Sequence, residues 1–72
     1  MTREQLLVLP QGTTLHHKTA KNADGTPVRC RITGKPRLWK RRPNYFEVPV
    51  KHGLRNSFRL TPQNIGEWEL PA

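Results

Sequence analysis

The sequence predicts an all-β protein, a small barrel of about five to six short antiparallel strands with one 3₁₀ turn before the last strand. Apolar and polar residues alternate in PVRCRIT, YFEVPV and SFRL, as side chains do on the two faces of a strand. Turn-forming residues such as Asp24–Gly25 separate the runs. With 72 residues, the chain has room for one domain with a thin core.

The N-terminal part has two readings. Residues 1–12 are interpreted as an N-terminal extension and residues 13–72 as the small β-barrel domain. Thr2 and Gln5 have the spacing of a capping box, which opens a helical turn. The run LLVL that ends before Pro10 would suit an edge strand equally well. Both alternatives stay open at this point.

Residues 13–33 are predicted to form a hairpin that turns at Asp24–Gly25. In its second arm Val28, Cys30 and Ile32 share the inward face, and the arginines between them face outward. The run RLWKRR (37–42) is expected to be the next strand, and Pro43–Asn44 is expected to end it.

YFEVPV (45–50) and SFRL (57–60) are predicted to pair as a hairpin closed by residues 51–56. Pro49 lacks a ladder donor, which predicts a bulge or an edge there. Thr61–Pro62 is a helix start and Gly66 a stop, so a 3₁₀ turn should precede the last strand, EWEL. The predicted core consists of Val28, Ile32, Phe46, Val48, Val50, Phe58 and Leu60.

From residue 26 onward, this order of strands with a late 3₁₀ turn resembles the SH3-like small barrel. The resemblance is one of architecture over roughly residues 26–70 and includes no diagnostic motif. It implies a fold that serves many functions, among them the binding of nucleic acid, peptides or proteins.

The charge of the chain points to a polyanionic partner. Thirteen Lys and Arg residues against five Asp and Glu give a net charge of +8, and such a domain attracts polyanions. Seven of the basic residues lie in RCRITGKPRLWKRR (29–42), with a tryptophan in its middle. Arg29 and Arg31 share a strand face, and a regular next strand would put Arg37, Trp39 and Arg41 on one face.

These residues predict a nucleic-acid-binding face that works mainly through phosphates, on DNA or RNA. Trp39 would stack on a base, or it would belong to the core. Lys51, Arg55 and Arg59 form a second basic group. The predicted contact residues are Arg29, Arg31, Lys35, Arg37, Trp39, Lys40, Arg41, Arg42, Tyr45 and Arg59.

The alternative function is a protein-interaction module or inhibitor that docks on an acidic protein. A phage or plasmid origin would suit either function, and both a monomer and a homodimer stay open. Steep salt dependence would favour nucleic acid, whereas one aromatic anchor on one protein would favour the alternative.

Other functions are not expected. His16, His17, Cys30 and His52 lack the paired spacing of a zinc site, and no nucleophile–base set can be assembled, so we expect no enzyme, metal or cofactor. Glu67 and Glu69 are expected to pair with arginines across strands. No apolar run suits a membrane span, and a lone cysteine favours a reducing, cytoplasmic setting.

Overall fold

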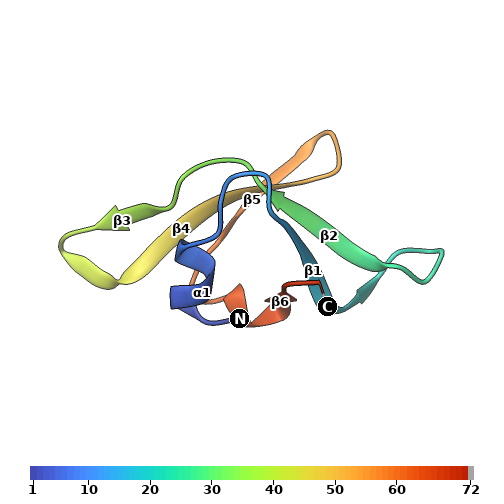
Figure 1. Ribbon diagram of the computed structural model, residues 1–72, viewed down its shortest axis with the longest axis horizontal. Coiled ribbons are helices and arrows are strands. Elements are labelled where there is room, and N and C mark those ends of the chain that lie inside the picture. The colour runs from blue at the N-terminus through green and yellow to red at the C-terminus, as the bar shows by residue number, and fades with distance from the viewer. Residues whose placement is uncertain (72) are drawn as a thin grey trace.

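The computed structural model describes residues 1–71 and consists mainly of antiparallel β-sheet (Figure 1). The all-β prediction is therefore confirmed. The elements in chain order are α1 (Arg3–Leu7), β1 (Thr14–Lys21), β2 (Pro27–Ile32), β3 (Arg37–Trp39), β4 (Arg42–His52), β5 (Asn56–Leu60), the 3₁₀ helix η1 (Ile65–Glu67) and β6 (Trp68–Glu69).

Strand β4 organises the sheet. It pairs with β3 along its first half, and with β2 and β5 along its second half, in the order β3-β4-β2-β1-β6 with β5 on β4. The β3–β4 and β1–β2 hairpins extend to opposite sides, and the β4–β5 hairpin projects between them (Figure 1). No pairing joins β5 to β6 within residues 1–71, so the sheet is open and the SH3-like barrel is not confirmed.

The β1–β2 hairpin forms where the sequence predicts it. Asn22 donates its backbone N–H to the carbonyl of Thr26 at 2.7 Å, and Thr26 donates its own N–H to Asp24 Oδ1 at 3.0 Å. Gly25 adopts φ +87°, a region that favours glycine. The turn therefore depends on the chemistry of Asp24 and Gly25, as predicted.

The β3–β4 hairpin differs from the prediction. The chain turns at Lys40–Arg41, and Pro43 and Asn44 lie inside β4 instead of in a loop. The register shifts between Leu38↔Phe46 and Trp39↔Arg42, so residues 43–45 bulge out of the ladder. Pro43 is tolerated there because a bulged residue needs no ladder N–H.

Pro49 causes no comparable shift. The β4–β5 register runs without interruption from Val48↔Leu60 through Pro49↔Arg59 to His52↔Asn56. Of the two predicted alternatives, the bulge is therefore wrong. The edge remains, because β2 pairs with β4 at Val50 and Lys51 and β3 pairs with it only as far as Glu47, so neither of these strands pairs with Pro49. The carbonyl of Pro49 accepts the N–H of Thr33 at 2.9 Å, just where β2 ends.

The predicted helical turns are present at both ends. Thr2 and Gln5 form the capping box of α1, so the helix is confirmed over the edge strand. After β5, the N–H groups of Asn64 and Ile65 donate to the carbonyl of Thr61. Gly66 lies within η1 and does not end it, which corrects the predicted stop.

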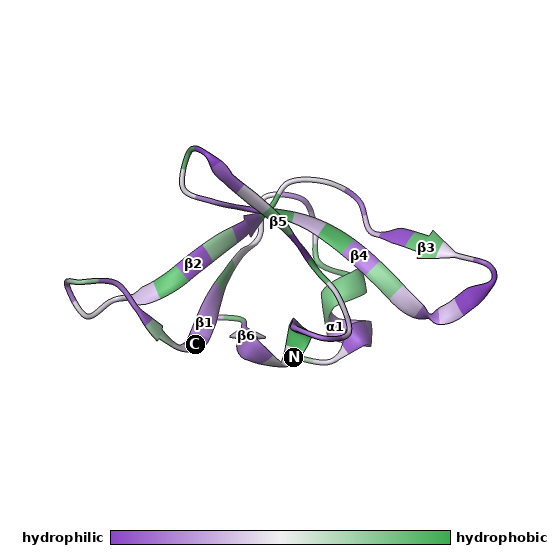
Figure 2. Cartoon of the chain, turned by 180° about the vertical axis from the view of Figure 1, so that it is seen from behind, coloured by the Kyte–Doolittle hydropathy of each residue, from purple (hydrophilic) through white to green (hydrophobic). Residues whose placement is uncertain are grey.

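The core lies on one side of β4, and apolar and polar bands alternate along β2 and β4 (Figure 2). Val28 and Phe58 are only partly buried, which corrects their assignment to the core. Helix α1, β1 and β6 supply three core residues that the prediction did not include. The buried apolar residues are Leu6, Leu15, Cys30, Ile32, Phe46, Val48, Val50, Leu60 and Trp68.

Candidate nucleic-acid interface

The outward face of β4 carries the candidate interface. Phe46, Val48 and Val50 are buried, so the alternation of a strand turns the odd-numbered residues between and beside them away from the core. These outward residues are Tyr45, Glu47, Pro49 and Lys51. The neighbouring strands β2, β3 and β5 place their own outward residues beside these, opposite β4 in each strand pair.

Two aromatic side chains meet at the β3–β4 end of this face. The ring centroids of Trp39 and Tyr45 are 5.3 Å apart and the rings are tilted by 57°. Trp39 is 36% exposed, so it is a surface residue and not part of the core. Because the bulge in β4 shifts the register beside it, Trp39 faces Arg42 across the hairpin.

Arginines flank both rings. The guanidinium carbon of Arg42 lies 4.2 Å from the centroid of the Tyr45 ring, and that of Arg37 lies 5.7 Å from the Trp39 ring. Both distances fall within the range of cation–π contacts. We call Arg37, Trp39, Arg42 and Tyr45 the aromatic platform. Its rings have flat faces for stacking, and its guanidinium groups carry charge and hydrogen-bond donors.

Glu47 is the carboxylate beside the platform, and its neighbours offset its charge. The Tyr45 hydroxyl donates to Glu47 Oε2 at 2.8 Å, and Arg59 Nη1 lies 3.6 Å from Glu47 Oε1. Arg37 is its cross-strand partner on β3. The hydrogen bond to Glu47 is the main cause that raises the pKa of Tyr45.

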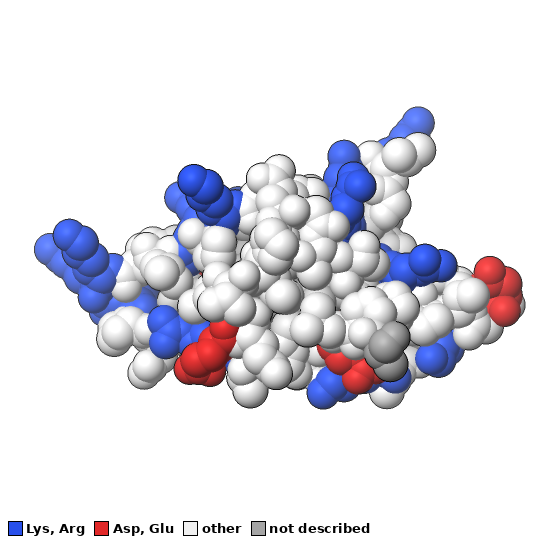
Figure 3. All heavy atoms as spheres, viewed as in Figure 1, with Lys and Arg blue, Asp and Glu red and all other residues white. Residues whose placement is uncertain are grey.

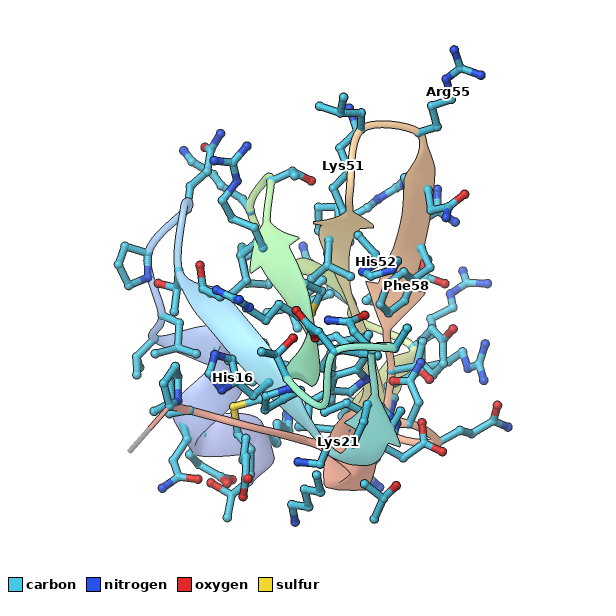
Figure 4. The ribbon with its side chains drawn as sticks, turned by 90° about the vertical axis from the view of Figure 1, so that its right-hand side faces the viewer. His16, Lys21, Lys51, His52, Arg55 and Phe58 are labelled. Atoms are coloured by element: carbon cyan, nitrogen blue, oxygen red, sulfur yellow. The ribbon has the colours of Figure 1, made fainter. Side chains whose placement is uncertain are left out.

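A second basic site lies where β2 meets the far part of β4. Arg31 and Lys51 are directly opposite each other in this antiparallel pair, and both are exposed. We call them the Arg31–Lys51 pair. Arg29 lies two residues earlier on the same face of β2, and His52 Nδ1 lies 2.7 Å from its carbonyl oxygen. In Figure 4, Lys51 and Arg55 project from the β4–β5 hairpin, far from Lys21 on β1.

The predicted contact residues therefore divide between two sites. Arg37, Trp39, Arg42 and Tyr45 form the platform, and Arg59 reaches it through Glu47. Arg29 and Arg31 lie on β2, which β4 separates from β3. The single face predicted from residues 29–42 is therefore wrong, because the long β4 inserts between β2 and β3 and separates these arginines into two sites.

The remaining predicted residues lie in connections. Lys40 and Arg41 form the β3–β4 turn, so Arg41 does not continue the face of Arg37 and Trp39 as predicted. Lys35 is exposed in the link between β2 and β3. Figure 3 shows Lys and Arg along the upper side, over the β3–β4 hairpin at the left, and also on the lower side and toward the right, while the few acidic side chains lie on the lower side and at the right end.

Two residues of the interface were not among the predicted contacts. Lys51 was placed in a second basic group, but its partner is Arg31. Glu47 has no predicted role, yet it joins Tyr45 to Arg59. Both relations depend on register between distant strands. The outward position of each residue was readable from the alternation in YFEVPV.

His17 and Cys30, which could in principle serve in metal binding or catalysis, have structural contacts instead. His17 Nδ1 accepts the backbone N–H groups of Thr19 and Ala20, and its ring packs edge-on against Trp68 at 4.9 Å. Burial raises the pKa of the Cys30 thiol to about 12, which makes it a poor nucleophile. Within residues 1–71, no three His, Cys, Asp or Glu residues are grouped to hold a metal ion.

The expected pairing of the last acidic residues with arginines is wrong. Glu69 lies opposite His16 in the β1–β6 pair, and Glu67 belongs to η1, with Oε2 3.9 Å from His17 Nε2. Strand β6 pairs with β1, whose neighbouring residues there are histidines. Glu67 and Glu69 therefore lie away from the platform, unlike Glu47.

No protein-family model, curated protein or solved structure matches this chain. No helix among residues 1–71 is long and apolar enough to cross a membrane.

Proposed function

We propose that this protein binds nucleic acid through the outward face of β4. The observation that carries the proposal is the aromatic platform: the exposed Trp39 and the half-buried Tyr45 pack against each other at a tilt of 57°, with arginines against both rings. Proteins that bind DNA or RNA without strong sequence preference combine aromatic stacking surfaces with a positive groove. The net charge of +8 supplies the long-range attraction.

An exposed tryptophan needs an explanation in so small a protein. A chain with a thin core gains stability by burying its largest apolar side chains, and Trp68 is 5% exposed whereas Trp39 is 36% exposed. The arm that carries Trp39 extends beyond the core and packs few apolar groups (Figure 1). These features favour a partner that covers Trp39.

The fold and setting that fit this function are also proposals. The pairing order β6-β1-β2-β4-β5, with η1 just before β6, supports an SH3-like arrangement to which β3 is added as an extra arm. Cys30 is a free buried thiol, which suits a reducing, cytoplasmic environment. Neither proposal is needed for binding at the platform.

Trp39→Ala tests the proposal directly. Affinity for single-stranded DNA or RNA should fall by about 1–3 kcal/mol, while urea unfolding stays close to that of wild type. Leu38→Ala is the matched control, because Leu38 is an exposed apolar residue of the same strand at 61% and does not belong to the platform. Affinity is measured by fluorescence anisotropy of labelled oligonucleotides at several salt concentrations.

Two results would contradict the proposal. In the first, the protein binds neither DNA nor RNA at low salt, and its charge must then serve an acidic protein partner. In the second, Trp39→Ala and Leu38→Ala weaken binding equally, so that the platform has no special role. Binding that falls steeply with salt and selectively with Trp39→Ala supports the proposal.

A further inference from the structure

We infer that the ligand is a single strand, laid along the outward face of β4 from the aromatic platform to the Arg31–Lys51 pair. This inference rests on the proposed function and adds the class of ligand, its path and its minimum length. Three observations carry it: the exposed Trp39 ring beside the half-buried Tyr45 ring at one end, two like charges at the other, and outward residues of β4 with hollows between them.

The platform favours unpaired bases. A base in a duplex is stacked on its neighbours, so it offers no free face to a side chain, whereas a base in a single strand does. Beside the rings, Arg42, Asn44, Tyr45, Pro62 and Gln63 border a surface hollow. The side chains of Asn44 and Gln63 supply amide groups next to the Tyr45 ring, which suits a splayed-out base.

The Arg31–Lys51 pair favours an anion. Like charges directly opposite in an antiparallel pair destabilise a sheet, and neither residue has a carboxylate within ion-pair distance among the described residues. The hollow beside them is lined by Arg29, Thr14 and the β4–β5 turn residues Gly53 and Leu54. A phosphate group here would offset the repulsion between two positive charges that the fold places together.

The path between the two ends is open and lacks a free negative charge. Glu47 is engaged by the Tyr45 hydroxyl and by Arg59. Next along β4, Pro49 lies beside a hollow of about 510 Å³ that Thr33, Ser57 and Arg59 also line. A backbone that crosses this hollow would pass the Arg59 guanidinium, which is 57% exposed.

The spacing sets a minimum length. Tyr45 and Lys51 belong to the same strand, and six residues at about 3.3 Å each give a span of about 20 Å. Outward residues recur about every 7 Å along a strand, close to the separation of phosphates in an extended single strand. Three such steps need about four nucleotides, so shorter strands should reach only one end of the path.

The test is a length series of oligothymidine and oligouridine, from two to twelve nucleotides, against wild type and two double variants. Affinity should rise in a step at about four nucleotides. Arg31→Gln with Lys51→Gln should remove this step and weaken the dinucleotide no more than the loss of the same charge elsewhere does. On long strands the same variant should reduce the slope of log K against log salt by about 0.7, because the pair holds one phosphate and each phosphate contact on a single strand contributes about 0.7.

Lys18→Gln with Lys21→Gln is the control, since it removes the same charge from exposed positions of β1. It should lower affinity at all lengths without changing the step. If both double variants behave alike, or if no step exists, the path is wrong while binding at the platform stands. If a duplex binds as well as a single strand of equal charge, the single-strand assignment is wrong. If no oligonucleotide binds, the proposed function fails as well.

Discussion

Tyr45 contributes a ring to the platform and a hydroxyl to Glu47, and its acidity reports on this second contact. The hydrogen bond to Glu47, burial and the nearby carboxylate charge raise the pKa of Tyr45. Glu47→Gln should therefore lower the pKa of Tyr45 toward its ordinary range. The chain has one tyrosine, so the titration can be followed by tyrosinate absorbance. An unchanged pKa would show that the hydroxyl does not donate to Glu47 in solution.

Cys30 should be unreactive in the folded protein. It is 2% exposed, and burial raises the pKa of its thiol from an ordinary 9.0 to about 12. The folded state therefore keeps the proton while the unfolded chain loses it, so Cys30 makes the protein less stable as pH rises from 9.0 toward about 12. Thiol-specific labelling at neutral pH should be slow in buffer and fast in urea. Equal rates would contradict the burial of Cys30.

The exposure of Trp39 could not be predicted from the sequence. The sequence offers two alternatives, a stacking residue or a core residue, because Leu38 and Trp39 are adjacent in a run that is otherwise basic and shows no clear period. The shifted register in the β3–β4 hairpin decides its position. In contrast, the inward set Phe46, Val48 and Val50 follows from alternation alone and is confirmed.

At the scale of elements, the turn before η1 depends on Asn64 more than on the predicted cap, Thr61. Asn64 Oδ1 accepts the N–H of Thr61 at 2.8 Å and its Nδ2 donates to the carbonyl of Arg59 at 3.0 Å. Thr61 Oγ1 accepts only a 3.3 Å bond from the N–H of Gln63. At about 0.5–1.5 kcal/mol for each hydrogen bond, Asn64→Ala should cost about 1–3 kcal/mol.

Urea unfolding measures this difference. Thr61→Ala should cost less than Asn64→Ala, and Gln63→Ala is the control because the exposed Gln63 contributes only its backbone N–H to the turn. If Thr61→Ala lowers the free energy of unfolding more than Asn64→Ala does, the Thr61 side chain and not that of Asn64 is the main stabiliser of the turn. Sequence reasoning identified the turn from Thr61–Pro62, but side-chain bonds back to β5 were not readable from it.

The positions of the strands were more predictable from the sequence than the pairing between them. The hairpin of β1 and β2 followed from alternation and from Asp24–Gly25, which are local signals. The turn at Lys40–Arg41 was missed because Pro43–Asn44 is the stronger turn signal by composition. Inside β4 that signal is overridden by a bulge, in which a proline costs no ladder bond.

At the scale of the molecule, the open sheet spreads over 43 × 22 × 19 Å and leaves little interior. The missing core residues Leu6, Leu15 and Trp68 come from α1, β1 and β6, segments too short or too mixed for a clear period. Because β4 lies between β2 and β3, the basic residues form two sites instead of one face. The order of strands depends on contacts between segments that are distant in the sequence, so local patterns do not predict it.

Leu6 tests whether residues 1–12 are an extension or part of the folding unit. Its side chain is 0% exposed and packs in the core, while the Thr2–Gln5 capping box holds α1 in place. Leu6→Ala should cost about 2–5 kcal/mol, a large share of the stability of so small a domain. Val8→Ala is the control, because Val8 is 78% exposed and should change stability by less than about 0.5 kcal/mol.

The measurement is urea unfolding of both variants and of a chain that begins at Thr13. If the shortened chain unfolds at the same urea concentration as the full one, residues 1–12 are an extension and α1 adds nothing to the core. If it is destabilised at least as much as Leu6→Ala, α1 closes the open side of the sheet and belongs to the same cooperative unit as β4.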